Sequence, residues 1–232
     1  MAVKTGEFIE IEYTGMIKED SFVFDTTNEK IAKDNNIHDP KSEYTPIVIC
    51  IGQGQLIKGL DADIEGKDVG KDYTIDVLPE NAFGKKSAKL LKLVPTSVFR
   101  KQNIVPQVGL PVNIDGTDGT IKTVTGGRTI VDFNHPLSGR EITYKYKILK
   151  MVTDDAEKIK SLLSVVLNIP MKNIDVKVDQ GKATIEMAKM PEPIEKEFAK
   201  KIKELISTIK DVKFTEKGAK KPKTTDIESK KQ

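Results

Sequence analysis

The first eighty residues alternate between apolar and polar positions in short runs, a period of two that is typical of half-buried antiparallel strands. The pattern predicts strands at residues 8–13, turning at Thr14-Gly15 into 16–17, and at 22–24, 47–51 and 73–78. A polar run at residues 28–45 predicts a short helix and loops, and the segment 52–60 opens another short helix. This part of the chain is therefore expected to be mostly β with few helices.

Residues 87–136 contain short β-branched runs separated by turns with glycine. The runs cover residues 112–114, 120–124 and 129–133, and turns of this kind predict a small independent β unit. Residues 141–152 then alternate again, with Ile142, Tyr144, Tyr146 and Ile148 on one face. This last strand needs a sheet to join.

The pattern changes to a helical period after residue 152, behind a candidate N-cap at Thr153 or Asp154. A hairpin at residues 174–178 and 182–187 follows, and Pro191 starts a second amphipathic helix. With a short strand at 212–214 the order is α-β-β-α-β. The basic tail, 217–232, has almost no apolar residues and is expected to be a solvated, disordered end.

Composition narrows the class of protein. A chain of 232 residues with 38% hydrophobic and 31% charged residues predicts a soluble protein of two or three domains. No apolar run approaches the ~20 residues of a membrane span, and the N-terminus lacks a secretory signal, so the expected location is cytoplasmic. The single cysteine, Cys50, lies in an apolar run and is expected to be buried and inert.

The sequence lacks the residues that nucleotide-binding and metal-binding sites need, and gives little support for nucleic-acid binding. The Gly52 and Gly54 pair has Ile57 where a dinucleotide-binding loop has its third glycine. His38 and His135 are the two histidines and lie far apart in sequence, so no metal site and no cofactor are expected. A net charge of +3 is too small to indicate nucleic-acid binding, and that alternative depends on one cluster of basic residues: Lys85, Lys86, Lys89, Lys92, Arg100 and Lys101.

Five short motifs in order resemble the signature of FKBP-type peptidyl-prolyl cis/trans isomerases. They are Ile11-Glu12-Tyr13-Thr14-Gly15, Val23-Phe24-Asp25-Thr26-Thr27, the segment from Ile51 to Leu60, Gly66 to Gly70, and Pro79 to Gly84. The later Asn134-His135-Pro136-Leu137-Ser138-Gly139 looks like the SlyD-type branch, and a chain with an extra C-terminal domain would belong to its long, archaeal-type members. The C-terminal part itself matches nothing comparably specific. The resemblance covers roughly residues 3–152.

This resemblance implies an α+β fold in which an FKBP-like antiparallel sheet wraps on a short helix. The isomerase domain would be discontinuous, at residues 1–86 and 137–152. A small β domain, 87–136, would be inserted in its flap and act as a chaperone, and an α+β domain, 153–216, would follow. The last domain has a sheet edge that a second copy could extend, so a homodimer is a further expectation.

The resemblance also implies the site. Tyr13, Asp25 and Phe83 would be catalytic, with Asp25 held by the Tyr13 hydroxyl and the Ile57 backbone N–H binding a substrate carbonyl. Around them would lie a substrate-binding cradle of Phe24, Ile49, Leu56, Ile57, Leu60, Leu137 and Tyr144. Single-domain relatives usually have Phe, Trp and Tyr where Ile49, Leu60 and Phe83 stand, so this cradle is more aliphatic and has one hydroxyl fewer.

The expected partners are unfolded or partly folded polypeptides with X-Pro bonds, and neither membranes nor nucleic acids. Clients would contact the insert through Leu90, Leu91, Leu93, Val94, Val98 and Phe99. The alternative is that these side chains form the insert's own core, which a fifty-residue domain needs. The alternative function is a non-catalytic holdase on the same scaffold.

Overall fold

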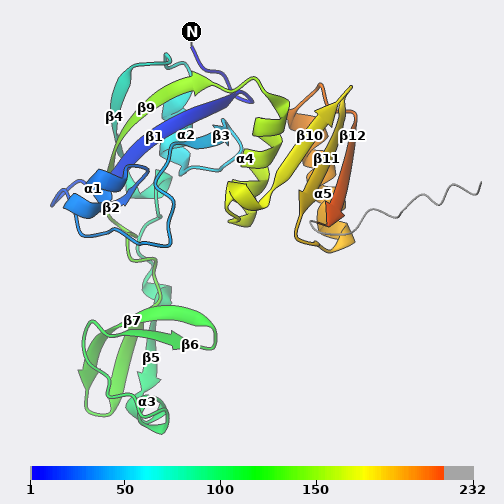
Figure 1. Ribbon diagram of the computed structural model, residues 1–232. Coiled ribbons are helices and arrows are strands. Elements are labelled where there is room, and N and C mark those ends of the chain that lie inside the picture. The colour runs from blue at the N-terminus through cyan, green and yellow to red at the C-terminus, as the bar shows by residue number, and fades with distance from the viewer. Residues whose placement is uncertain (1, 217–232) are drawn as a thin grey trace, which may run out of the picture.

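The computed structural model describes residues 2–216, and the predicted tail, 217–232, lies outside the described residues. The described part is a mixed α+β structure dominated by antiparallel pairing, with three sheets (Figure 1). Among residues 2–216, every helix is too short or too polar to span a lipid bilayer.

The first sheet contains five strands, all paired antiparallel. They are β1 (Phe8–Ile17), β2 (Val23–Thr26), β3 (Ile47–Cys50), β4 (Asp72–Val77) and β9 (Ile142–Met151). The order is β2-β1-β9-β4, and β3 pairs with β1. The strand predicted at residues 141–152 is β9, and it pairs with β1 on one side and β4 on the other. The turn predicted at Thr14-Gly15 is wrong, because β1 continues through it with an irregularity between Gly15 and Met16.

Two short helices accompany this sheet, α1 (Glu29–Asp34) and α2 (Lys58–Ile64). The Asn28 side chain caps α1 by accepting hydrogen bonds from the backbone of Lys30 and Ile31. Helix α2 buries Leu60 and Ile64 in one core with apolar side chains of β1, β4 and β9. Gly59 permits this close packing, since a Cβ atom at this position would overlap the side chain of Val77.

We expect Gly59→Ala to destabilise the protein, although alanine is the better helix former by about 1 kcal/mol. Forcing a methyl group into a filled contact costs typically about 1–3 kcal/mol, which outweighs that gain. The denaturant midpoint of unfolding measures the change. Lys58→Ala, at an exposed position of the same helix, is the matched control, and a Gly59→Ala protein more stable than this control would contradict the packing argument.

The second sheet is four-stranded and stands apart from the first, joined to it by two chain crossings (Figure 1). Its strands are β5 (Leu91–Pro95), β6 (Pro111–Ile114), β7 (Thr117–Thr125) and β8 (Arg128–Asp132), in the order β5-β8-β7-β6. The three predicted strands are confirmed as β6, β7 and β8. Strand β5 and helix α3 (Thr96–Lys101) were not predicted.

The third sheet has β10 (Asp175–Asp179), β11 (Lys182–Met187) and β12 (Asp211–Glu216). Strands β10 and β11 form the predicted hairpin, whereas β12 pairs parallel to β11 through the crossover helix α5 (Glu192–Leu205). Helix α4 (Asp155–Leu167) begins behind Asp154, whose side chain accepts a hydrogen bond from the Glu157 N–H at 2.7 Å. Of the two predicted N-caps, Asp154 is confirmed.

Helix α4 lies between the first and third sheets (Figure 1). Phe8, Val48 and Cys50 from the first sheet share one buried cluster with Ile159, Leu162 and other side chains of the C-terminal part. The C-terminal part therefore shares a core with one side of the first sheet. Cys50 is buried as predicted, and burial raises the pKa of its thiol to about 11.

Candidate active site

Aromatic side chains from four segments converge at one end of the first sheet. Tyr13 comes from β1, Phe24 from β2 and Tyr144 from β9, and Phe83 follows the 3-10 turn η1 (Pro79–Asn81). The ring of Phe24 meets the rings of Phe83 and Tyr144 edge-on, with centroids 5.7 and 6.1 Å apart. Tyr13 and Tyr144 are tilted at 5.8 Å. Edge-to-face contacts are a favoured packing of aromatic rings, and the four rings together form one aromatic wall.

Gly15 allows the wall to form. It is the β1 partner of both Asp25 and Tyr144, so the two neighbouring strands place their side chains beside it. A Cβ atom on Gly15 would lie 2.8 Å from Cζ of Phe24 and 2.9 Å from Cε1 of Tyr144, closer than carbon atoms pack. The position therefore needs glycine, although its backbone is not in the left-handed region. The sequence pattern assigned Gly15 to a turn, whereas the structure shows that it leaves space for the two rings.

One polar pair stands at the edge of this wall. The Tyr13 hydroxyl donates a hydrogen bond to Oδ2 of Asp25 at 2.9 Å. Burial, and then the neighbouring Asp25 carboxylate, raise the pKa of Tyr13, so its hydroxyl keeps its proton and remains the donor. Burial also raises the pKa of Asp25, and the hydrogen bonds from Tyr13 and from the Thr26 backbone oppose that shift. The predicted Tyr13–Asp25 partnership is present.

Aliphatic side chains complete the site. Ile49 and Leu60 are buried, while Leu56, Ile57 and Leu137 are half-buried and pack against the same cluster. Ile57 is the residue before α2, and in the described part of the chain its backbone N–H has no hydrogen-bond acceptor. Nine of the ten predicted catalytic and substrate-binding residues thus belong to or pack against the apolar core of the first sheet, and Asp25 joins them through its bond to Tyr13.

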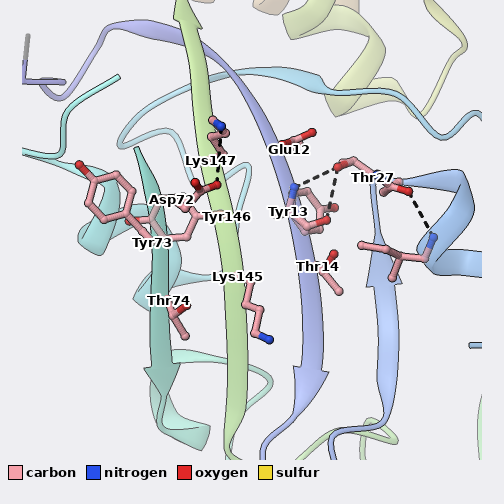
Figure 2. A pocket seen from close by; sticks show the side chains of 12 residues that line it. Glu12, Tyr13, Thr14, Thr27, Asp72, Tyr73, Thr74, Lys145, Tyr146 and Lys147 are labelled. Carbon is pink, nitrogen blue, oxygen red and sulfur yellow. Dashed lines mark hydrogen bonds and ion pairs between the residues drawn. The ribbon is translucent and has the colours of Figure 1, made fainter. Parts of the chain in front are cut away.

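Two pockets border Tyr13. One, of about 360 Å³, is lined by Tyr13, Phe24 and Asp25 together with the loop that carries Tyr44. The other, of about 260 Å³, is shown in Figure 2, where Lys145 and other side chains of β1, β4 and β9 line it. Because side chains alternate along a strand, Lys145 faces away from Tyr144 and from the aromatic wall. The pocket beside Asp25 is the one that continues the predicted site.

The predicted client residues separate into two groups. Leu90, Leu91 and Leu93 are 40%, 45% and 60% exposed, and Val94 and Val98 are half-buried. The prediction that Phe99 contacts clients is corrected by its burial. Phe99 is 2% exposed and forms the core of the second sheet with Val112, Ile121 and Val131. Val105 and Val108, in the loop before β6, are also exposed, at 73% and 69%. Isolated valines in a loop have no periodic signal, so the sequence did not indicate them.

Two protein-family models match the chain. The FKBP-type peptidyl-prolyl cis-trans isomerase family matches residues 1–100, and a model described as FKBP26, IF domain, matches residues 92–137.

Curated relatives agree with the first of these models. A short-type peptidyl-prolyl cis-trans isomerase of Methanocaldococcus jannaschii is 31% identical over 155 residues, which are 67% of this chain and 98% of the relative. A probable FKBP-type 16 kDa isomerase of Pseudomonas fluorescens is 31% identical over 48% of this chain and 76% of its own length. The SlyD isomerase of Vibrio cholerae is 30% identical over 53% of this chain and 64% of its own. With the motifs and the aromatic site, these matches show that the chain belongs to the FKBP-type peptidyl-prolyl cis-trans isomerase family.

Proposed function

We propose that this protein catalyses cis/trans isomerisation of X-Pro bonds in partly folded polypeptides, and that it holds such clients on its second sheet while doing so. The observation that supports the catalytic part best is the Tyr13–Asp25 pair at the edge of a continuous apolar and aromatic wall. A site of this kind has no nucleophile poised for covalent chemistry, and isomerisation requires none.

The chemistry of the X-Pro bond explains why such a site suffices. Rotation destroys amide resonance and has a barrier of about 18–20 kcal/mol, and a twisted amide is less polar than a planar one. The apolar substrate-binding cradle, with Phe24, Leu60 and Tyr144 among its residues, therefore favours the twisted form. The Ile57 N–H donates a hydrogen bond to the substrate carbonyl, and the Asp25 carboxylate points a hydrogen-bond acceptor into the cradle. Each ~1.4 kcal/mol of preference for the transition state gives a tenfold rate increase.

Client holding is the second part of the proposal. Leu91 and Leu93 expose large apolar side chains on the edge strand β5 of a sheet that already has its own small core, and Leu90 does so just before this strand. Val105 and Val108 are exposed in the loop before β6. Exposed apolar side chains of this kind suit transient contact with unfolded segments. In this proposal residues 87–136 are the insert, 1–86 with 137–152 the isomerase domain, and 153–216 the C-terminal domain, in a cytoplasmic protein.

The C-terminal domain is proposed to form a homodimer. Strands β10 and β12 are the two edges of its sheet, and an edge strand offers unpaired backbone groups to a second copy. Light scattering at micromolar concentration measures the mass. Twice the chain mass supports the dimer, and a monomeric mass removes it.

A proline-limited refolding reaction tests the proposed function. Catalytic amounts of the protein are expected to accelerate the slow phase, which uncatalysed takes tens to hundreds of seconds. The holdase alternative predicts suppression of aggregation with an unchanged slow phase. Measuring both quantities on the same client separates the two functions.

A further inference from the structure

His135 has no role in the site described above, yet its ring lies flat on one of the site's aromatic side chains. The rings of His135 and Phe83 are stacked with centroids 4.7 Å apart and 2° between their planes. In residues 2–216 the other two stacked pairs, His38–Tyr44 and Tyr73–Tyr146, lie at 5.3 and 5.4 Å and are tilted by more than 20°. His135 is exposed, so a buried packing role does not explain its position.

Hydrogen bonds in the following turn fix the histidine ring. The Leu137 N–H donates to Nδ1 of His135 at 3.2 Å, and the Ser138 N–H donates to the His135 carbonyl at 2.9 Å. Because Nδ1 accepts, the neutral ring carries its proton on Nε2. The ring therefore has little freedom to rotate away from Phe83.

The same turn also holds the backbone of Phe83. The Ser138 hydroxyl donates to the Phe83 carbonyl at 3.0 Å, and the Gly139 N–H donates to the Gly84 carbonyl at 2.8 Å. Phe83 thus has its main chain tied to one turn, one ring face covered by His135, and an edge contact with Phe24 at 5.7 Å. These contacts determine where the half-buried ring of Phe83 points.

The turn is anchored where the chain crosses between the first two sheets. Oδ1 of Asn134 accepts from the Ser87 N–H at 2.8 Å, and Nδ2 of Asn134 donates to the Ser87 carbonyl at 3.1 Å. This two-bond clamp joins the segment entering the second sheet to the segment leaving it. The residue that follows the clamp is His135.

We propose that His135 is a positioning residue for the prolyl site: its ring holds Phe83 in the orientation that completes the aromatic wall. It acts through Phe83 and does not itself touch the substrate. The proposal rests on the proposed isomerase function, because the orientation of Phe83 affects activity only if a substrate proline binds against the aromatic wall.

Four variants of the full-length chain test this role. Three are single variants, His135→Ala, His135→Phe and Phe83→Ala, and the fourth combines His135→Ala with Phe83→Ala. For isomerisation of a short Xaa-Pro peptide, we expect His135→Ala to lower kcat/KM about three- to tenfold, as the loss of one ring contact predicts. His135→Phe keeps a flat ring and is expected to stay within about twofold of the parent. The double variant should have the same kcat/KM as Phe83→Ala alone, since both substitutions remove the same contact between His135 and Phe83.

Phe22→Ala is the matched control, because it removes a ring that is 52% exposed and lies outside the site, and it is expected to leave kcat/KM unchanged. The proposal is overturned if His135→Ala matches the parent, if His135→Phe loses as much as His135→Ala, or if the effects of His135→Ala and Phe83→Ala multiply.

A readout that needs no activity separates this proposal from the proposed function. The NMR shifts of the Phe83 ring protons are expected to change in His135→Ala and to be largely retained in His135→Phe. An inactive parent protein whose Phe83 shifts follow this pattern would refute the isomerase function and leave the positioning contact established. Unchanged Phe83 shifts in His135→Ala would refute the positioning role whatever the activity.

Discussion

Phe83→Ala and Asp25→Ala are expected to lower kcat/KM for a short Xaa-Pro peptide by about tenfold or more each, a loss of at least roughly 1.4 kcal/mol of transition-state stabilisation. Phe83→Ala opens the wall beside Phe24, and Asp25→Ala leaves the Tyr13 hydroxyl without its acceptor. Suppression of aggregation is expected to stay nearly intact, because neither side chain belongs to the second sheet. A peptide isomerisation assay and a light-scattering aggregation assay measure the two effects.

Matched controls exist for both substitutions. Phe22 is 52% exposed just before β2, and Asp72 is an exposed acid on β4 whose carboxylate lies 3.8 Å from Nζ of Lys147. Phe22→Ala and Asp72→Ala are expected to leave the rate unchanged. Equal losses of isomerisation and aggregation suppression in the site variants would refute the separation of the two functions.

Replacing the second sheet, residues 91–132, with a short flap is expected to reduce the activity on protein clients while leaving isomerisation of short peptides in place. If the second sheet binds clients as proposed, acceleration of a proline-limited refolding reaction should fall about ten- to hundredfold, because the client loses the high effective concentration that a tethered binding surface provides. The rate for a short peptide should persist. The replacement keeps Ser87, Asn134 and His135, so that the support of Phe83 is not removed together with the client surface.

A milder variant controls for the deletion. Leu91→Ser with Leu93→Ser removes exposed apolar side chains from an edge strand while leaving the Phe99 core in place, so the sheet is expected to remain folded. It should reproduce most of the loss in refolding activity. If both variants accelerate refolding as well as the parent, the second sheet is not a client-binding surface.

The sequence predicted the elements with a clear period and missed those without one. Strand β9 alternates with one face fully buried, and the apolar face of α4 repeats at helical spacing behind Asp154, so both were found. Strand β5 lies at the edge of its sheet with most side chains exposed, which leaves no alternation to detect. Helix α3 has six residues, too few to show a helical period. Parallel pairing of β12 depends on how α5 packs, which no local pattern contains.

The site could be predicted only through the order of its motifs. Single apolar residues on strands look the same whether they line a core or a cradle, so Ile49 and Leu60 were assigned by resemblance alone. The roles of Gly15 and His135 depend on atoms from distant segments, the rings of Phe24 and Tyr144 in one case and that of Phe83 in the other. Phe99 was misplaced because exposure on a short helix cannot be read from composition.

The position of β9 between β1 and β4 determines the order in which the chain can fold during synthesis. The central strand of the first sheet, Ile142–Met151, is translated after every strand of the second sheet, the last of which ends at Asp132. All residues of the second sheet, with the exposed leucines of β5 and their supporting core, are therefore synthesised before β1 and β4 can pair with their shared neighbour. During translation, the residues of the surface proposed to hold other proteins are all present while the first sheet still lacks the strand that joins β1 to β4.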